Sequence, residues 1–404
     1  MTTKKICVIG LGYIGLPTAA FLASKGFDVC GVDTSPSIVE TVNNGEIHIV
    51  ENGLDEIVRS SVKNGKLIAY SEPQLSDIYI ICVPTPFHEG GKVPCPNIDI
   101  VLDATRSIAH LLKSDDIVIL ESTSPVGTTK KIAIELKNFG ANLDNVLIAY
   151  CPERVLPGNI LNELESNDRI IGGLNDKATK VVSEFYKSFV RGRVHETSAK
   201  TAEMCKLTEN SFRDVNIAFA NELSMLCKKD SIDVWELINL ANCHPRVNIL
   251  QPGVGVGGHC IAVDPWFIVS RDEDNSKIIK TAREVNLYKT EWVEKEIENE
   301  VHKYNKNVLP KVAFFGIAFK PNIDDFRESP ALTVVNNMKN KLQDIMVVEP
   351  NINKFSDINI TPVCDAVKYS DICIFLVKHD EFLSINQEDF KEGAKILDFC
   401  GVFK

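Results

Sequence analysis

Residues 5–15, KICVIGLGYIG, specify the fold of the N-terminal part of this chain. Its apolar half predicts a short strand that ends at Gly10, and residues 17–25 suit a helix. The pattern G-x-G-x-x-G between a strand and a helix is typical of a dinucleotide-binding turn, because Gly12 lets a pyrophosphate approach and the helix N-terminus offers it free N–H groups. We expect contacts to a dinucleotide from Gly10, Gly12, Tyr13, Ile14 and Gly15.

A carboxylate follows at the position where such a site contacts a ribose. Asp33 ends the second predicted strand, FDVCGVD at residues 27–33. A carboxylate there accepts hydrogen bonds from the adenosine ribose and repels a 2′-phosphate, so the sequence favours NAD over NADP. Ser35 leaves a small ambiguity in this choice. The alternative for the whole motif is a glycine turn that only packs a strand on a helix.

Further apolar runs alternate with helix-length segments, which predicts a parallel, doubly wound sheet. Two of these runs end in VPTP, residues 83–86, and in ESTSP, residues 121–125. Ligands of open α/β sheets bind at the carboxyl ends of strands. The alternatives are a stiff turn in the first motif and a helix N-cap in the second. The residues expected to contact cofactor or substrate are Val83, Pro84, Thr85 and Thr123.

The middle of the chain has no glycine or proline between Gly192 and Pro245. It predicts a long helix over residues 200–229, with Ser198 as its N-cap. A second helical stretch covers residues 266–309, and the alternation of strands and helices then restarts.

This order predicts an α/β protein with two Rossmann-like parallel-sheet domains joined by a central long-helix dimerisation domain. The expected domains are residues 1–195 for dinucleotide binding, residues 196–305 for the central domain with the cysteine loop described below, and residues 306–404 for the C-terminal domain.

Composition narrows the classes of function. The formal net charge is −11 and no long block of Lys and Arg occurs, which argues against a nucleic-acid partner. No segment offers the ~18 consecutive apolar residues of a membrane span, and glycines interrupt the apolar N-terminal stretch, so it is not a signal peptide. The 12 cysteines form no CxxC pair. We therefore expect reduced thiols in a cytoplasmic protein, no metal site and no membrane partner.

The densest chemical signal is GVGVGGHC, residues 253–260. Gly257 and its neighbours let the backbone approach a ligand, and Cys260 follows directly, with Asp264 one helical turn further on. A nucleophilic thiolate lets a dehydrogenase go past the aldehyde, because a thiohemiacetal can donate a second hydride and water cleaves the thioester that results. The alternative is that Cys260 is one more small buried residue.

Other polar residues suit the same chemistry. Lys206 and Asn210 share one face of the predicted long helix, with Arg213 close by, and an ammonium beside an amide can stabilise an oxyanion. An ordinary solvated helix face is the alternative. Glu153 ends a predicted strand, next to Arg154, where it suits proton transfer or the ordering of water.

Three further cations are candidates for contacts to a substrate anion or a diphosphate. Arg246 precedes the glycine-rich segment, and Lys320 and Arg327 follow the first strand of the C-terminal domain. The alternative is that these residues are ordinary surface charges.

The chain resembles the UDP-glucose/GDP-mannose dehydrogenase family over essentially its whole length. The resemblance implies an N-terminal NAD domain, a central helical dimerisation domain and a C-terminal domain that binds the UDP-sugar. It also implies that two NAD oxidise a C6 hydroxyl to a carboxylate. The motifs that carry it stand in the family's order: GLGYIGLPTA, VPTP, ESTSPVGTT, YCPERVLPG, AEMCKLTENSFRDVNIAFANE, HPRVN, GVGVGGHCIAVDP and GIAFKPNIDDFRESPA.

By position, the resemblance also implies roles. Cys260 matches the family's nucleophile, and Asp264 matches the carboxylate that supports it. Lys206 and Asn210 match the pair that stabilises the reacting oxygen. The full set of expected substrate-binding residues is Arg154, Lys206, Asn210, Arg213, Arg246, Gly257 and Lys320.

The remaining roles concern water, cofactor and a second subunit. Glu153 and Thr123 match residues associated with the water and the hydroxyl. Arg246 matches an arginine that reaches the substrate from the neighbouring subunit of a homodimer. Lys320 looks like a lysine that contacts sugar and diphosphate, and Arg327 like an arginine near the nicotinamide of the cofactor.

One departure bears on the substrate. Members that act on UDP-glucose usually carry a lysine just before the aspartate, where this chain has Val263. The stretch GHCIAVDPWF, residues 258–267, looks most like members that act on UDP-N-acetyl-D-mannosamine, so we favour this 2-acetamido sugar over UDP-N-acetylglucosamine and UDP-glucose. A two-electron dehydrogenase of the hydroxyacid type would need neither Cys260 nor residues 311–404, and a non-catalytic nucleotide sensor is a third class.

Overall fold

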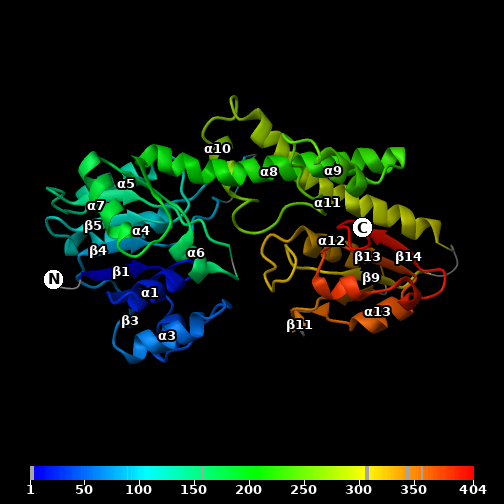
Figure 1. The fold of residues 1–404 in the computed structure, drawn as a ribbon, viewed down its shortest axis with the longest axis horizontal. Helices are drawn as coiled ribbons and strands as arrows, with labels where there is room; N and C mark the ends of the chain where they lie inside the picture. The colour runs from blue at the N-terminus through cyan, green and yellow to red at the C-terminus, as the bar shows by residue number, and fades with distance from the viewer. Residues whose placement is uncertain are drawn as a thin grey trace. The chain divides into compact units, whose positions relative to one another are not determined.

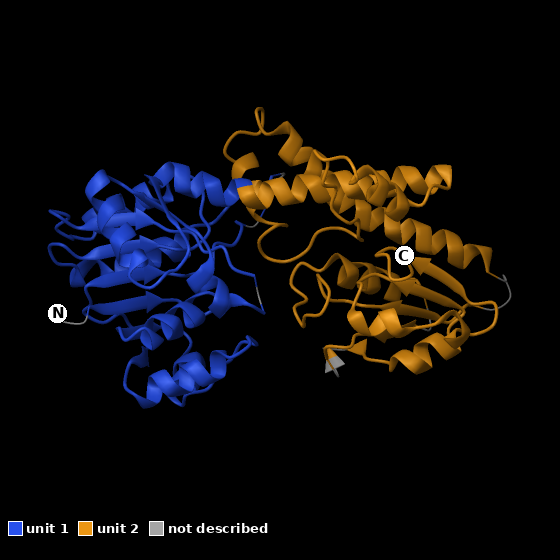
Figure 2. Ribbon diagram, viewed as in Figure 1, with its two compact units in different colours: residues 1–208 blue, residues 209–404 orange. Residues whose placement is uncertain are grey.

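The computed structural model describes residues 4–88, 90–91, 93–156, 158–304, 309–342, 345–352, 354–355 and 358–404. Two compact units make up the chain, residues 1–208 and 209–404 (Figure 2). The long helix α8 (Ala199–Asp230) begins in the first unit and continues in the second (Figure 1). Ser198 accepts the N–H of Thr201 at 3.2 Å, which confirms the predicted N-cap.

The first unit contains a sheet with the strand order β3-β2-β1-β4-β5-β6-β7-β8. Its strands are β1 (Lys5–Ile9), β2 (Asp28–Val32), β3 (Leu67–Tyr70), β4 (Ile78–Ile81), β5 (Ile117–Leu120), β6 (Leu147–Tyr150), β7 (Arg169–Gly173) and β8 (Val194–Ser198). Its helices are α1 (Gly15–Ser24), α2 (Pro36–Asn43), α3 (Leu54–Lys63), α4 (Asp99–Ile108), α5 (Thr128–Asn138), α6 (Ile160–Ser166) and α7 (Asp176–Lys187).

One pairing departs from the parallel sheet that the sequence predicts. Strand β7 runs antiparallel to β6, whereas β8 again pairs in parallel with β7. The chain returns from β6 through the short helix α6 and pairs with the strand it has just left, which an antiparallel neighbour permits without a crossover. The other neighbours in this sheet pair in parallel.

Both faces of this sheet are covered. Ile6 and Val8 of β1 belong to one hydrophobic core, and Cys7 and Ile9 belong to the core on the other face. Burial raises the pKa of Cys7 to about 12, so this thiol is inert packing material. A sheet buried on both sides in this way matches the doubly wound architecture.

The second unit joins helices to a smaller, four-stranded sheet with the order β10-β9-β13-β14, all parallel. Its strands are β9 (Val312–Phe315), β10 (Ile345–Val348), β13 (Ile372–Phe375) and β14 (Lys395–Asp398), with a separate pair formed by β11 (Lys354–Phe355) and β12 (Ile358–Asn359). Its helices, besides α8, are α9 (Val234–Ala241), α10 (Asp264–Val269), α11 (Lys277–Lys303), α12 (Pro330–Lys339) and α13 (Val363–Tyr369). Within the described ranges, no helix has both the length and the apolarity that a bilayer span requires.

The two sheets repeat one turn geometry. Gly10 after β1 and Gly316 after β9 have φ values of +91° and +87°. Each donates its N–H to the end of the neighbouring strand, at 2.7 and 2.8 Å. Asp33 and Glu349 then accept backbone N–H groups from the turn that follows each glycine. Glu349 differs from Asp33 because its side chain is fully buried. Its carboxylate lies 3.3 Å from the His379 ring and therefore interacts with a group of the protein itself.

A buried polar network ties α8 to α11 and to the glycine-rich loop. Arg283 pairs with Asp214 at 2.6 Å, and both side chains are buried. Asn286 donates to the same carboxylate at 2.8 Å and accepts a hydrogen bond from Asn221 at 2.9 Å. The side chain of Asn221 in turn accepts the N–H of Gly253 at 2.9 Å. The base of the loop is therefore fixed from the two long helices.

Replacing Asp214 by Ala should lower the free energy of unfolding by about 3–5 kcal/mol, because it leaves the Arg283 guanidinium buried without its counter-charge. The matched control is Glu284→Ala, whose carboxylate is exposed and lies 3.8 Å from Lys280. We expect a loss of less than about 1 kcal/mol for the control. Urea denaturation of both variants measures the difference, and equal losses would contradict this account of the network.

Candidate active site

The glycine turn after β1 leaves one side open. A Cβ atom at Gly10 would lie 2.7 Å from the carbonyl oxygen of Cys82, and one at Gly15 would lie 1.7 Å from that of Gly10. At Gly12, by contrast, no atom of the described residues other than its two chain neighbours lies within 4 Å of the place where a Cβ would stand. Two glycines are thus required by packing, while the third leaves a cradle at the start of α1 that fits a pyrophosphate.

Asp33 lies beside this turn, half-buried at the end of β2. Its two carboxylate oxygens accept the N–H of Leu11 at 3.0 Å and that of Ser35 at 2.9 Å. A carboxylate has about four acceptor positions, so capacity is left for ribose hydroxyls. The residues that could hold NAD therefore fit it, and Asp33 also holds the turn itself in place.

A hydrogen bond joins the segments that follow β4 and β5. The Thr85 hydroxyl donates to the carbonyl oxygen of Thr123 at 2.7 Å. Val83 and Thr123 are half-buried, whereas Pro84 is exposed. The alternative reading of Thr123 as a helix N-cap is wrong, because α5 begins only after Gly127 and the buried Glu203 carboxylate accepts the N–H groups at its start.

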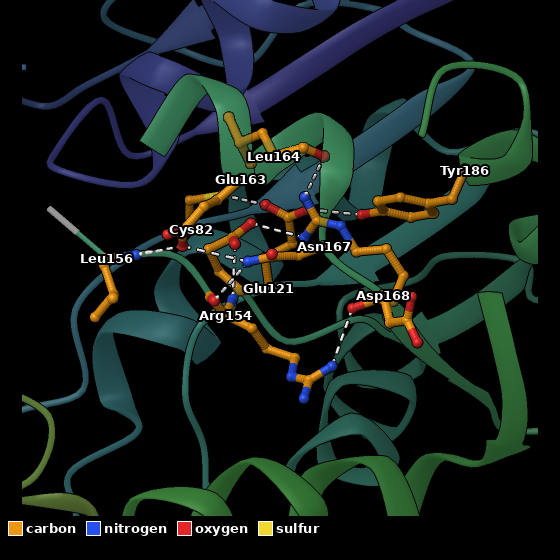
Figure 3. A network of polar contacts seen from close by, with 11 residues as sticks. Cys82, Glu121, Arg154, Leu156, Glu163, Leu164, Asn167, Asp168 and Tyr186 are labelled. Carbon is orange, nitrogen blue, oxygen red and sulfur yellow. Dashed lines mark hydrogen bonds and ion pairs between the residues drawn. The ribbon is translucent and has the colours of Figure 1, made fainter. Parts of the chain in front are cut away.

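Glu153 is buried after β6 and forms an ion pair with Arg169 at 2.7 Å. Arg169 is also buried at the start of β7 and donates to the carbonyl oxygen of Leu164 at 3.1 Å (Figure 3). Arg154 is half-buried, and its guanidinium donates to the carbonyl oxygen of Asp168 at 3.0 Å (Figure 3). Arg169 could not be predicted from the sequence, because nothing in the local pattern shows that β7 folds back beside β6.

A second buried carboxyl group, that of Glu121, interacts electrostatically with Glu153 and Arg169. Tyr186 donates to Glu121 at 2.6 Å, and the Cys82 thiol lies 3.3 Å from the same carboxyl group (Figure 3). Burial raises the pKa of Glu121, and repulsion from Glu153 raises it further, against the lowering effect of Arg169. The carboxylate that forms an ion pair with Arg169 is that of Glu153.

The glycine-rich loop packs tightly against the segment before α12. A Cβ atom at Gly257 would lie 2.5 Å from the carbonyl oxygen of Glu328. Gly258 has φ +80° and donates its N–H to the carbonyl oxygen of Arg327 at 3.1 Å. Cys260 follows in the turn that leads into α10, where it is half-buried and belongs to none of the hydrophobic cores. The reading of Cys260 as ordinary core packing is therefore wrong.

Asp264 and Asn210 come together with the cysteine turn. The N–H of Asp264 donates to the carbonyl oxygen of Cys260 at 2.8 Å. The Asp264 side chain is buried, and its carboxylate accepts a hydrogen bond from the Asn210 amide at 2.5 Å. An amide has two N–H donors, so this contact leaves one for another partner.

Two cations on α8 lie near Asn210 along the helix. Lys206, one turn earlier, is half-buried and makes no hydrogen bond or ion pair with any described residue. A half-buried ammonium without a protein partner can stabilise charge on a ligand. Arg213 is exposed and likewise has no partner among the described residues.

The other candidate cations differ in how they are held. Lys320 is half-buried after β9, and Arg246 is exposed; neither side chain pairs with a described residue. Arg327 is exposed. Its Nε donates hydrogen bonds to both carboxylate oxygens of Asp325, at 2.9 and 3.1 Å. Burial alone would raise the pKa of Asp325, but the hydrogen bonds from Arg327 lower it below its usual value. Sequence analysis missed this role of Asp325, although the D-x-R spacing signals it.

Family models match nearly the whole chain. The model of the NAD binding domain of the UDP-glucose/GDP-mannose dehydrogenase family covers residues 4–190, and that of the central domain covers residues 200–288. The model of the UDP binding domain covers residues 313–404. The cofactor expected from the glycine turn and Asp33, NAD, is thereby confirmed.

Individual proteins agree with the family models. A UDP-N-acetyl-D-mannosamine dehydrogenase from Campylobacter jejuni is 51% identical, over 98% of this chain and 99% of its own length. An NDP-N-acetyl-D-galactosaminuronic acid dehydrogenase from Ralstonia nicotianae is 47% identical, over 99% of this chain and 96% of its own length.

A solved structure, described as a UDP-D-ManNAc dehydrogenase from Pyrococcus horikoshii, has a TM-score of 0.90 and 37% identity, and the match covers 99% of this chain and 96% of that one. These relatives match the chain over nearly its full length, so the match includes both sheets and the cysteine loop. The chain belongs to the UDP-glucose/GDP-mannose dehydrogenase family.

Proposed function

We propose that this dehydrogenase oxidises the C6 hydroxyl of a UDP-2-acetamido sugar to the carboxylate, with UDP-N-acetyl-D-mannosamine as its substrate. The observation that carries the chemistry is Cys260, half-buried in a turn whose backbone is bonded to the buried pair of Asp264 and Asn210. The choice of sugar is supported by the Campylobacter jejuni relative and the Pyrococcus horikoshii structure.

The first oxidation removes a hydride and a proton from the alcohol and gives an aldehyde. NAD, when bound, accepts the hydride in each of the two oxidations. Lys206 and the free N–H of Asn210 stabilise negative charge on the reacting oxygen. Thr123 holds the hydroxyl group, and its carbonyl oxygen is already fixed by Thr85.

The second oxidation needs sulfur. The Cys260 thiolate adds to the aldehyde carbon, and the thiohemiacetal loses its hydride to become a thioester. Asp264 takes part as the carboxylate that orients Asn210 and supports the cysteine. Water then cleaves the thioester to the carboxylate and the free thiol, and Glu153, held in place by Arg169, orients that water.

The remaining cations serve the charged substrate. We assign Lys320 and Arg246 to the diphosphate and sugar, since both are cations without a protein partner in the described chain. Arg154, Arg213 and Gly257 complete the proposed substrate site. Arg327, oriented by Asp325, lies on the nicotinamide side in this proposal.

A homodimer is part of the proposal, with Arg246 reaching the site of the neighbouring subunit. Helix α8 exposes Phe212, Phe219 and Leu226, at 68%, 52% and 55% of their surface. These residues repeat every seven positions, the spacing of a helix-pairing seam. We further assign residues 1–195, 196–305 and 306–404 to NAD binding, dimerisation with the cysteine loop, and UDP-sugar binding. A cytoplasmic location is supported by 12 free cysteines, three of them exposed.

Purified enzyme with NAD should convert UDP-N-acetyl-D-mannosamine faster than UDP-N-acetylglucosamine, UDP-N-acetylgalactosamine or UDP-glucose, and should form two NADH per uronate, as followed by absorbance and product mass. Replacing Cys260 by Ala should reduce uronate formation by about 10³-fold or more. The matched control is Cys243→Ala, because Cys243 is an exposed thiol outside this site.

Each outcome tests a different part of the proposal. Preference for UDP-glucose would overturn the choice of sugar and leave the mechanism standing. One NADH per sugar, or full turnover by the Cys260→Ala variant, would exclude the thioester route.

Replacing Asp33 by Asn should raise the KM for NAD by about tenfold, because a charged hydrogen-bond acceptor for the ribose is lost. The control is Asp28→Asn, which removes a partly exposed carboxylate that pairs with Lys66 at 2.8 Å at the other end of the same strand. Steady-state kinetics with varied NAD measure both constants, and an unchanged value for the Asp33 variant would argue against the ribose contact.

Replacing Phe219 by Lys should dissociate the dimer, because it puts a charge into the apolar seam of α8. The control is Ile134→Lys on α5, which is similarly exposed at 51% but lies outside the seam. Analytical ultracentrifugation gives the mass of each, and a Phe219→Lys variant that stays dimeric would move the interface elsewhere.

A further inference from the structure

A cavity of about 480 Å³ lies within the second unit, lined by residues of α8, α9 and α11 and of the chain around the end of β14. None of the residues assigned above to catalysis, NAD or the UDP-sugar lines it. The volume falls within the range of about 300–1,000 Å³ that small-molecule sites occupy.

The cavity has a buried lysine in its wall. Lys289 of α11 is only 2% exposed. Its ammonium donates to the Ser224 hydroxyl at 2.7 Å and lies 4.0 Å from the centre of the Trp292 ring. No Asp or Glu of the described chain forms an ion pair with it. Lysine is almost never buried unless it is paired, because an uncompensated charge is costly away from water.

The two carboxylates that line the cavity, those of Asp233 and Asp398, already have partners within the protein. Asp398 accepts the N–H of Gly401 at 2.7 Å and that of Phe403 at 3.0 Å. Asp233 pairs with Lys404 at 2.6 Å. Neither carboxylate forms an ion pair with Lys289. Lys289 in the wall and the exposed Lys228 are cations without an ion-pair partner among the described residues.

The other walls are aromatic. Trp235, Trp292 and Phe399 line the cavity. Ring faces of this kind pack well against a flat ring of a ligand. Aromatic walls and an unpaired buried cation together describe a complementary ligand that has a flat body and one anionic group.

We propose that this cavity is a second ligand site, which binds a small organic anion with a planar ring. Its phosphate or carboxylate pairs with Lys289, and its ring packs against Trp292 and Trp235. The site lies apart from the proposed chemistry and does not depend on the identity of the sugar substrate.

A dependence on pH follows from the same geometry. Burial lowers the pKa of Lys289 to about 7, and Glu296 opposes this effect weakly. The other charged groups that line the cavity are Lys228, Asp233, Asp398 and Lys404. The ammonium form binds the anion, so affinity falls as the amine loses its proton above about pH 7.

Trp fluorescence can test the proposal, since two of the chain's three tryptophans line the cavity. The full-length protein is titrated with phenyl phosphate and with benzoate, and with inorganic phosphate and benzyl alcohol as probes that lack the ring or the charge. We expect saturable quenching by the two ring anions, with at least about tenfold weaker binding of the half-probes. The tighter of the two ring anions identifies a phosphate ester or a carboxylate as the ligand class.

Variants separate this site from adventitious binding. Lys289→Met keeps the length of the side chain and should weaken both ring anions at least about tenfold, abolish the loss of benzoate affinity above about pH 7 and leave benzyl alcohol unchanged. Lys229→Met, at an exposed lysine of α8 that does not line the cavity, should bind like the parent. Parent-like binding of the ring anions by Lys289→Met, or no saturable quenching of the parent, would overturn the proposal. The Lys228→Met variant gives a second reading, because an intermediate loss of affinity is expected there.

Discussion

The close approach of two glycines to the segment before α12 is the constraint on which the proposed chemistry depends. No side chain fits at Gly257 or Gly258, because the carbonyl oxygen of Glu328 and the Phe319 ring already occupy that space. The glycine-rich loop therefore packs directly against this segment, and the N–H of Gly258 donates a hydrogen bond to the carbonyl oxygen of Arg327. From there the chain turns directly into α10, which leaves the Cys260 thiol in a turn and outside the cores.

Two residues to which the proposed chemistry assigns a role are held by ion pairs, one buried and one at the surface. Arg169 holds Glu153 in a buried ion pair. Asp325 orients the exposed Arg327 by hydrogen bonds to its guanidinium. Removing one member of the buried Glu153–Arg169 pair would leave the other charge without compensation, so position and stability are coupled at that pair. Lys206, by contrast, has a half-buried ammonium with no partner in the described chain, as a group kept for a ligand would have.

Features governed by local rules could be predicted from the sequence. The glycine turn with Asp33 and the cap at Ser198 follow from residue spacing and from the geometry of parallel sheets and helix ends. The reversal of β7 and the partner of Glu153 could not, because both depend on which strands pair across the chain. The cavity beside Lys289 was equally out of reach, since α8, α11 and β14 supply its walls from distant parts of the sequence.

The most direct test of the account is a search for the covalent intermediate. A Glu153→Gln variant, mixed with NAD and UDP-N-acetyl-D-mannosamine and quenched in acid, should carry the uronyl group on the peptide that contains Cys260, as detected by mass spectrometry. The account predicts that the adduct accumulates because water is no longer ordered for its cleavage. Release of two NADH per sugar by this variant with no adduct, or with the adduct on another thiol, would contradict the central role of Cys260.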